Sequence, residues 1–334
     1  MAETTMTERE RVGAAIARAV VDRPPVSLWK HFPERDQTAN DLAAATVAWQ
    51  ERFGFDFVKF MAPGDYPAID WGASTEFRGS PGGTRETTHA PIAKVGDWAA
   101  LRPVDVGSGF NGVILEALRE ARAQIVEDVP ILATIFSPLT IAQKLADGAA
   151  VEHLRAHPDD LRGALDVIAE VTAAMARASY EAGADGIFFA TQLADFETLD
   201  LAEYRTFGLP YDLRVIEAGK AAKPDGWTLL HLHGEAPMFD LVAGATYPVD
   251  ILNWHDRHAP PDLASGQRQS RHAVAGGLNE HTIAEAGPDA AVAEAREAIA
   301  ATHGRGLLVT PGCVIPVATP DETVAAVVAA VRGA

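Results

Sequence analysis

Eight short apolar runs, bounded by Gly, Pro or Asp, recur along the chain and alternate with Ala-rich helical segments. This alternation is typical of a parallel sheet that is buried on both faces, because each strand is followed by a crossover helix. The predicted strands are residues 26–32, 55–61, 129–136, 184–191, 227–234, 249–255, 273–279 and 306–313. Eight strands predict a single (β/α)8 barrel, an α/β fold in which residues 1–334 form one domain.

Helices are predicted between these strands, and one segment is too long to be a simple connection. The predicted helices are residues 38–52, 111–126, 138–147, 159–182, 201–222, 236–246 and 287–302, with an N-terminal helix at 7–21 and a closing helix at 320–332. Residues 62–110 form a long insertion after the second strand and are rich in Gly, Pro, Thr and Trp. Because loops at the carboxyl ends of barrel strands lie over the active site, we predict that this insertion is a lid, with a disordered spacer as the alternative.

The composition excludes several classes of partner. The chain has 28 Lys and Arg against 46 Asp and Glu, a formal net charge of -18, which argues against binding to a nucleic-acid backbone. Its single cysteine cannot form an intrachain disulfide, its first residues are acidic and polar, and no apolar stretch reaches the roughly 20 residues of a membrane span. We expect a cytoplasmic protein, monomeric or homodimeric, that takes a small-molecule substrate.

Polar residues occupy the predicted strand ends, where a barrel carries its catalytic groups. The clearest pattern is His231-Leu232-His233-Gly234, because residues two apart on a strand project to the same side and both imidazoles would share one face. Cys313 ends the last predicted strand after Thr310-Pro311-Gly312. Two imidazoles and one thiolate suit zinc better than magnesium or calcium, so His231, His233 and Cys313 are the predicted metal ligands; packing within the core is the alternative.

The other strand-end residues are candidates for catalysis and substrate binding. The lysines and histidine near the first two strands could bind a substrate carboxylate, or could be solvated charges at the rim. The residues after the seventh strand could bind substrate, support a zinc-bound imidazole or cap the following helix. The predicted catalytic residues are Lys30, His31, Lys59 and Glu280, and the predicted substrate-binding residues are Gln192, Trp254, His255 and Asn279.

The chain resembles the uroporphyrinogen decarboxylase superfamily over nearly its whole length. The matching segments are RPPVSLWKHFPERD, DWAALRP, FSPLTIAQKLADG, EAGADGIFF, LLHLHGEAP, DILNWHD, VAGGLN and LLVTPGCVIPVATPDET. The family contains decarboxylases of heme synthesis and zinc-dependent methyltransferases linked to cobalamin. The resemblance implies a barrel fold and one of these two activities.

Two departures from the family patterns bear on the choice between these activities. The Arg-rich motif that grips porphyrinogen carboxylates in the decarboxylases is replaced here by Ser27-Leu28-Trp29-Lys30-His31, and the decarboxylase motif Asn-Leu-Gly-His-Gly at the last strand is absent. His231 and Cys313 match two zinc ligands of the methyltransferase branch, and His233 stands where that branch has a cysteine.

The resemblance therefore implies a zinc-dependent methyltransferase that moves a methyl group between a corrinoid carried by a partner protein and a small acceptor. Zinc would present the acceptor as a thiolate or alkoxide. One alternative is a cofactor-free decarboxylase, in which the cationic residues bind carboxylates and a histidine delivers a proton. Another is a noncatalytic protein that binds a metal or a corrinoid.

Overall fold

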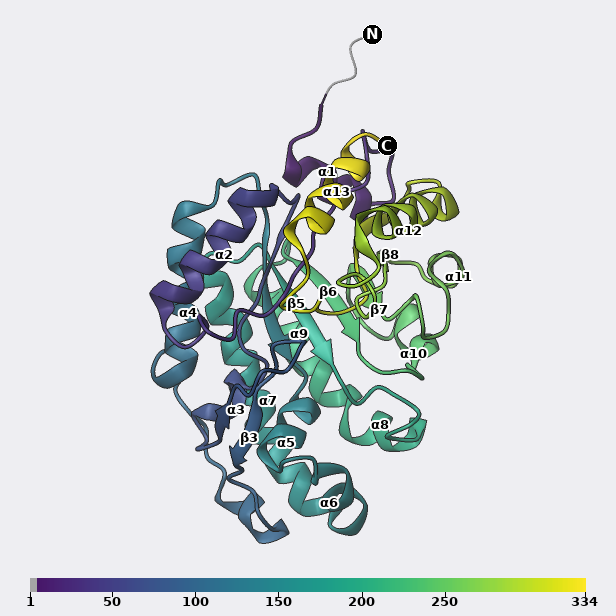
Figure 1. The fold of residues 1–334 in the computed structure, drawn as a ribbon. Coiled ribbons are helices and arrows are strands. Elements are labelled where there is room, and N and C mark those ends of the chain that lie inside the picture. Colours follow the sequence, from purple (N-terminus) through teal and green to yellow (C-terminus); the bar gives the residue numbers. More distant parts are fainter. Residues whose placement is uncertain (1–4) are drawn as a thin grey trace.

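The framework of the protein is a seven-stranded parallel sheet, described by a computed structural model over residues 5–334. The strands in sheet order are β1 (Val58–Phe60), β4 (Ile131–Phe136), β5 (Gly186–Thr191), β6 (Trp227–Leu232), β7 (Ile251–Trp254), β8 (Ala273–Leu278) and β9 (Leu307–Pro311). Every neighbouring pair of strands in this sheet is parallel, so their carboxyl ends share one edge (Figure 1). The predicted α/β fold with a parallel sheet is confirmed.

The predicted first strand, residues 26–32, differs from the expectation. It contributes a single parallel bridge between Val26 and Val309 in place of an eighth strand. The carbonyl of Val26 also accepts a hydrogen bond of 2.9 Å from the backbone N–H of Asp56, so the segment lies between β9 and the chain that leads into β1. Within residues 5–334 the expected (β/α)8 barrel is therefore not confirmed, because the sheet has seven strands and a single bridge stands in place of the eighth.

Local chemistry explains why the ladder stops there. Pro24 and Pro25 have no N–H to donate before the bridge. After it, the carbonyl of Leu28 accepts a hydrogen bond of 2.9 Å from the indole Nε1 of Trp49 on a neighbouring helix, and that oxygen is diverted from the sheet. Lys30 and His31 therefore follow an irregular segment and not a strand end.

Helices cover the outside of the sheet, as Figure 1 shows. They are α1 (Glu8–Ile16), α2 (Ala39–Phe53), α4 (Gly109–Gln124), α5 (Pro138–Leu145), α6 (Ala150–Ala156), α7 (Pro158–Glu181), α8 (Leu201–Phe207), α9 (Leu209–Ala222), α10 (Phe239–Ala243), α11 (Leu263–Gln269), α12 (Gly287–Thr302) and α13 (Asp321–Arg332). The helix predicted over residues 201–222 is divided at Gly208, and the N-terminal helix ends five residues before its predicted limit.

The insertion at residues 62–110 contains regular structure. Its elements are α3 (Tyr66–Ile69), the antiparallel strands β2 (Ser74–Glu76) and β3 (Glu86–His89), and a 3-10 helix, η1 (Val95–Ala100). The disordered alternative for this segment is therefore wrong.

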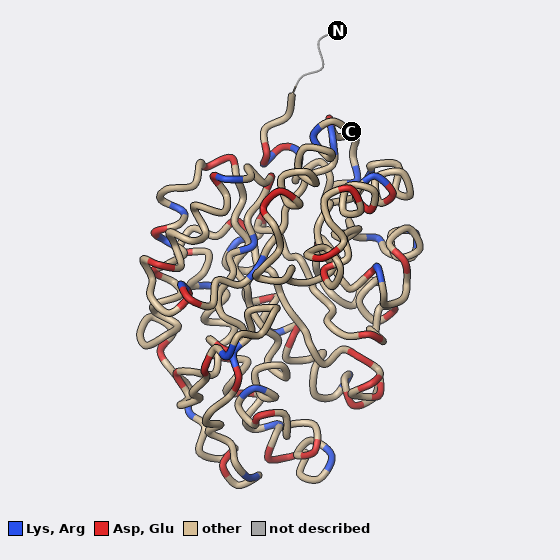
Figure 2. The backbone as a smooth tube through the Cα atoms, viewed as in Figure 1, with Lys and Arg blue, Asp and Glu red and all other residues tan. Residues whose placement is uncertain are grey.

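Charged residues lie mainly on the helices and loops around the sheet (Figure 2). Every residue of β4, β5, β8 and β9 is buried, as expected for a sheet that is covered on both faces. Within residues 5–334, no helix has the length and apolar character needed to cross a membrane.

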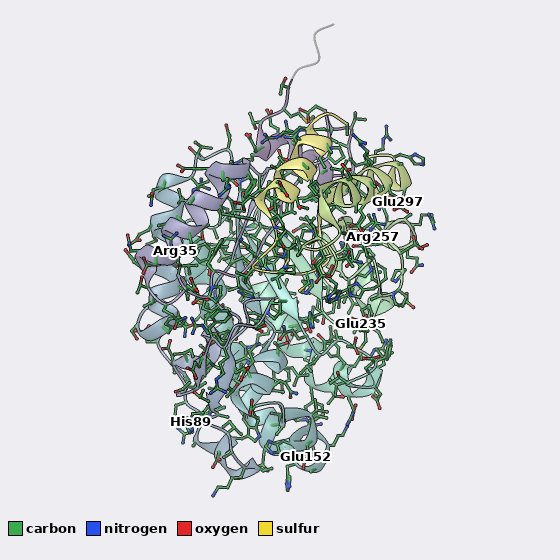
Figure 3. All side chains as sticks on the ribbon, viewed as in Figure 1. Arg35, His89, Glu152, Glu235, Arg257 and Glu297 are labelled. Atoms are coloured by element: carbon green, nitrogen blue, oxygen red, sulfur yellow. The ribbon has the colours of Figure 1, made fainter. Side chains whose placement is uncertain are left out.

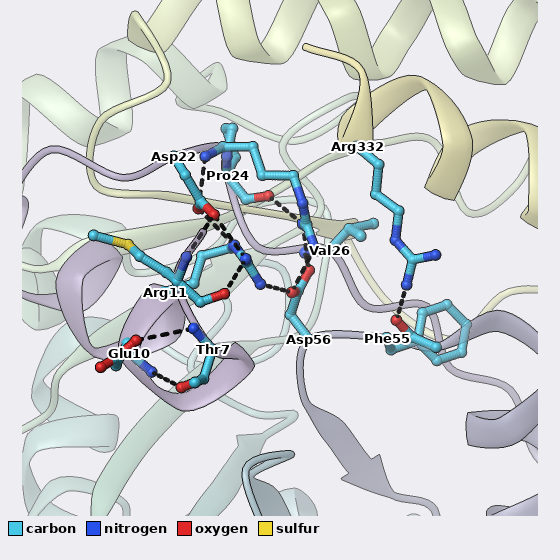
Figure 4. Close-up of polar contacts among 12 residues, drawn as sticks. Thr7, Glu10, Arg11, Asp22, Pro24, Val26, Phe55, Asp56 and Arg332 are labelled. Carbon is cyan, nitrogen blue, oxygen red and sulfur yellow. Dashed lines mark hydrogen bonds and ion pairs between the residues drawn. The ribbon is translucent and has the colours of Figure 1, made fainter. Parts of the chain in front are cut away.

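A buried ion cluster fixes the N-terminal segment against the sheet (Figure 4). The carboxylate of Asp56, fully buried, accepts hydrogen bonds from Arg11 Nη1 at 2.6 Å, from Arg23 at 2.7 and 2.9 Å, and from the backbone N–H of Val26 at 2.8 Å. Arg11 also binds Asp22, with Nε–Oδ1 at 2.7 Å. This cluster holds Val26 at the position where it bridges to β9.

Candidate metal centre

Four metal-binding side chains converge at the carboxyl edge of the sheet. His231 lies in β6, His233 follows directly after it, His255 follows β7 and Cys313 follows β9. Each offers one ligand atom, and these atoms all lie within 4.8 Å of one another. The three predicted ligands are thus brought together, and His255, predicted to bind substrate, joins them.

Two distances within this group are close to those between ligands of one metal ion. His255 Nε2 lies 3.1 Å from His233 Nδ1, and Cys313 Sγ lies 3.8 Å from the same nitrogen. For tetrahedral zinc, ligand bonds of roughly 2.0–2.3 Å place two nitrogens ~3.3 Å apart and a nitrogen and a sulfur ~3.6 Å apart. The donor set of three imidazoles and one thiol therefore fits a zinc ion.

Asn253 fixes the tautomer of His231. The Asn253 amide donates through Nδ2 to the carbonyls of Ala275 and Pro311, at 3.0 and 3.1 Å, so its Oδ1 must face the imidazole. His231 Nδ1 lies 2.6 Å from that oxygen and donates to it. The proton is thereby held on Nδ1, and Nε2 keeps the lone pair that a metal requires.

Glu280 fixes the tautomer of His255 in the same way. His255 Nδ1–H donates to Glu280 Oε1, and both side chains are buried. Burial opposes the charge of Glu280, but the hydrogen bond and charge of His255 outweigh it and hold the pKa of the carboxyl below its usual value. A carboxylate behind an imidazole is a common arrangement around metal sites, where it orients the ring and strengthens it as a ligand.

Burial favours the neutral form of two of these imidazoles, His231 and His233. It lowers the pKa of His231 well below its ordinary value, and it lowers the pKa of His233 to about 4, with further lowering by His255. Burial also raises the pKa of the Cys313 thiol to about 11, although Lys59 acts in the opposite direction. At neutral pH these two imidazoles can each offer a lone pair to a cation, whereas the thiol must release a proton to bind one.

Two glycines allow the strand ends to come this close. A Cβ on Gly234, whose φ is +124°, would lie 2.0 Å from Asp195 Oδ2. A Cβ on Gly312 would lie 2.8 Å from Glu280 Oε2 and 3.0 Å from the Cα of His255. Gly312 thus permits a close approach of the chain next to Cys313.

Of the predicted cationic residues, Lys59 lies near the candidate metal centre, because it contacts Phe188, whose ring is next to that of His231. It comes from β1, it is only 8% exposed, and its Nζ lies 3.9 Å from the ring centroid of Phe188 and 5.2 Å from that of Trp29. Within residues 5–334 no carboxylate forms an ion pair with it. Burial lowers the pKa of Lys59 to about 8, while Cys313 raises it. A buried ammonium without a counter-ion is suited to binding an anionic group.

Lys30 and His31 have different surroundings. Lys30 Nζ donates to the carbonyl of Val317 at 3.0 Å and lies 4.7 Å from the ring centroid of Trp49. His31 is 7% exposed, its Nδ1 has no hydrogen-bond partner in the described residues, and burial lowers its pKa to about 3. Both line a pocket of about 410 Å³.

Of the remaining predicted residues, Trp254 and Asn279 make structural contacts, and Gln192 lines a pocket. Trp254 is fully buried and its Nε1 donates to the carbonyl of Pro261 at 2.7 Å, which gives no support to a contact with substrate. Asn279 Oδ1 accepts hydrogen bonds from the backbone of His281 and Thr282, so it shapes a turn. Gln192 lines a small pocket of about 220 Å³.

The sequence interpretation missed two residues, Asn253, which orients His231, and His258, which approaches Glu280. Asn253 stands two residues before His255, and this is the same spacing that links His231 with His233. The signal was therefore present, because alternate residues of a strand share a face. His258 lies on the loop after β7, and its position next to Glu280 depends on the tertiary fold.

Comparisons with known proteins place the chain in a family. The family model described as uroporphyrinogen decarboxylase (URO-D) matches residues 7–334. The methylcobamide:CoM methyltransferase MtbA of Methanosarcina acetivorans is 25% identical over 95% of this chain and 95% of its own length. The uroporphyrinogen decarboxylase of Parasynechococcus marenigrum is 25% identical over 71% of this chain and 67% of its own.

The fold has a close counterpart among solved structures. A methyltransferase from Methanosarcina mazei superposes with a TM-score of 0.84, covers 98% of this chain and 99% of its own, and is 24% identical. The similarity in fold thus extends over the whole sheet and its helices. Together with the match of the family model over residues 7–334, this shows that the chain belongs to the uroporphyrinogen decarboxylase family of enzymes.

Proposed function

We propose that this protein is a zinc-dependent methyltransferase that transfers a methyl group between a corrinoid protein and a small acceptor. The observation that carries the proposal is the donor set of His231, His233, His255 and Cys313 at the carboxyl edge of the sheet. The name of the Methanosarcina acetivorans relative pairs a methylcobamide with CoM, which supports a corrinoid as the methyl carrier. Uroporphyrinogen decarboxylases are also relatives, so decarboxylation is the activity to be tested against.

The four side chains would hold zinc, which as a Lewis acid supplies a deprotonated acceptor at neutral pH. His231 would bind through Nε2, since Asn253 keeps the proton on Nδ1. His255 would bind through Nε2, since Glu280 accepts the Nδ1 proton. His233 and Cys313 would complete the set of residues that hold the ion.

Lys59 would bind an anionic group of the acceptor. Replacing Lys59 with methionine removes the charge and keeps a side chain of similar length. We expect KM for an anionic acceptor to rise about 30-fold, because this corresponds to the loss of a charge-assisted hydrogen bond of about 2 kcal/mol. Lys59→Arg should keep most of the affinity. Steady-state kinetics on both variants checks this, with zinc content as the control; equal KM values for Lys59→Met and wild type would remove Lys59 from the binding site.

The insertion at residues 62–110 would cover the entrance to the centre. The backbone N–H of Val317, in the loop after β9, donates to the carbonyl of Pro81 at 2.8 Å. A Cβ on Gly83 would lie 2.6 Å from the Cβ of His31. These contacts hold the insertion against the loops at the carboxyl edge of the sheet, which supports its proposed role as a lid.

Methyl transfer from methylcobalamin tests the function directly. Purified protein should contain one zinc per chain at this centre, and with a thiol acceptor it should convert methylcobalamin to cob(I)alamin and the methyl thioether. A chelator should stop the reaction and added Zn²⁺ should restore it. CO2 release from a carboxylated substrate that is indifferent to chelators would replace this proposal with decarboxylation. Zinc binding without turnover of any methyl donor would favour a noncatalytic binding protein.

A further inference from the structure

A second group of metal-binding side chains lies on the solvent side of the first. His258 comes from the loop after β7, and Glu280 and His281 come from the loop after β8. We call these three residues the outer cluster. His258 Nε2 lies 3.1 Å from His281 Nε2 and 3.6 Å from Glu280 Oε1, and His281 Nε2 lies 3.9 Å from that oxygen. The three potential ligand atoms therefore all lie within 3.9 Å of one another.

The two imidazoles of the outer cluster are oriented by short turns. The backbone N–H of His258 donates to the carbonyl of His255 at 3.0 Å, and the backbone N–H of His281 donates to Asn279 Oδ1 at 3.0 Å. The ring centroids of His258 and His281 are 4.4 Å apart. His281 has a side chain that is 60% exposed and that of His258 is 21% exposed, so core packing does not account for their convergence.

The charge at this point also favours a cation. Glu280 is 3% exposed, and its Oε2 has no hydrogen-bond partner in the described residues. Glu235, labelled in Figure 3, places Oε1 3.4 Å from His258 Nε2. Among residues 5–334 neither carboxylate forms an ion pair with Lys or Arg, and the ion pairs that they do form are with histidines. A buried carboxylate is costly unless a cation compensates it.

We propose that His258, Glu280 and His281 form a second site for a divalent transition-metal ion. Two imidazole nitrogens and one carboxylate oxygen suit Zn²⁺, Co²⁺ or Ni²⁺ better than Mg²⁺ or Ca²⁺, which prefer oxygen ligands alone. The separation of 3.1 Å between the two Nε2 atoms is close to the ~3.3 Å expected for two nitrogens on one tetrahedral ion. The site stands on its own ligands and does not require methyl transfer.

His255 connects the outer cluster to the first centre. Its Nε2 faces His233, and its Nδ1 donates to Glu280 Oε1, so one carboxylate orients an inner ligand and also belongs to the outer cluster. Glu280 is therefore unsuitable for separating the two sites by mutation. His258 and His281 are suitable, since neither is among the ligands proposed for the inner centre.

Titration of the metal-stripped, full-length protein with Co²⁺ distinguishes the two sites. A cobalt–thiolate bond at Cys313 gives a charge-transfer band, whereas a site of nitrogen and oxygen ligands gives ligand-field bands alone. We expect wild type to bind two equivalents, only one of which contributes the charge-transfer band. The double variant His258→Ala/His281→Ala should bind one equivalent and keep that band. Loss of a residue that only supports a metal ligand lowers metal affinity by roughly 10–100-fold. In the double variant, the affinity for a second Co²⁺ ion should fall by more than this.

Two further variants make the result unambiguous. Cys313→Ser should lose the charge-transfer band and keep the outer ligand-field bands, so a failure of the inner centre is seen separately. His89→Ala removes an exposed histidine that lies well apart from Glu235 in Figure 3, and it should leave both equivalents unchanged. The single variant His281→Ala, at a mostly exposed position, guards against misfolding of the double variant. The proposal would be overturned if wild type bound only one equivalent of Co²⁺. It would also be overturned if folded His258→Ala/His281→Ala bound a second equivalent as tightly as wild type does.

Discussion

Replacing His231 with alanine should weaken zinc binding by more than about 100-fold, or about 3 kcal/mol, and should abolish zinc-dependent methyl transfer. The imidazole of His231 is held in one orientation, because Asn253 fixes its tautomer and is itself bound to two backbone carbonyls. A water molecule in the vacated position would be a poorer ligand than a neutral imidazole with its lone pair already directed. Competition with a chromophoric chelator measures the zinc affinity of wild type and variant.

A graded series separates ligation from packing. Asn253→Ala leaves all four ligands in place but frees the imidazole of His231, so its zinc affinity should fall by roughly 10–100-fold, between wild type and His231→Ala. Thermal unfolding of the metal-free proteins measures how much of each change arises from the cavity. His89→Ala serves as the surface control. Zinc affinity in His231→Ala equal to that of wild type would exclude His231 from the centre.

The parts of the centre that could be predicted from sequence depend on strand periodicity. His231 and His233 share a face because they are two residues apart, and Cys313 was placed beside them because strand ends meet at one edge. The convergence of these three residues is confirmed. The sequence also predicts His255 at this edge, but as a substrate-binding residue, because strand order alone does not tell whether a ring points to a neighbour or to the entrance.

Features that depend on contacts between distant loops escaped the sequence interpretation. The approach of His258 to Glu280 joins residues that follow different strands, and no spacing in the sequence encodes it. The expected strand over residues 26–32 has the right apolar pattern, yet a side chain from another element takes one of its backbone groups. The indole of Trp49 donates to the carbonyl of Leu28. The segment is also held by its own side chain, because the hydroxyl of Ser27 donates to the carbonyl of Phe57 at 2.7 Å. Periodicity predicts which face is buried but not which partner satisfies each backbone group.

Lys30 and Lys59 also show what the sequence can predict and what it cannot. Lys30 and Lys59 were equivalent in the sequence, each near the end of a predicted strand. In the structure Lys59 lies in β1 against Phe188, whereas Lys30 binds the carbonyl of Val317 and stacks near Trp49. The difference follows from the first segment, which leaves the sheet after Val26, while Lys59 remains within a paired strand.

Replacing Asp56 with alanine should reduce the free energy of unfolding by about 3–5 kcal/mol, because it leaves two guanidinium groups beside a buried position without their shared carboxylate. The same change removes the acceptor for the N–H of Val26, and with it the restraint that holds the bridge to Val309. Urea denaturation measures the loss as a lower midpoint at an unchanged slope. Asp56→Asn retains an acceptor for Val26 but no charge for Arg11 and Arg23, so its stability should lie between wild type and Asp56→Ala.

Asp22 provides the matched control for this prediction. It also binds Arg11, through Nε at 2.7 Å, but its side chain is 19% exposed and Arg11 would keep Asp56 as a partner. Asp22→Ala should therefore cost clearly less than Asp56→Ala. If both variants lost the same small amount, below about 1 kcal/mol, the ion cluster would be a minor surface contact, and the single bridge at Val26 would have to hold the first segment between β9 and β1 without it.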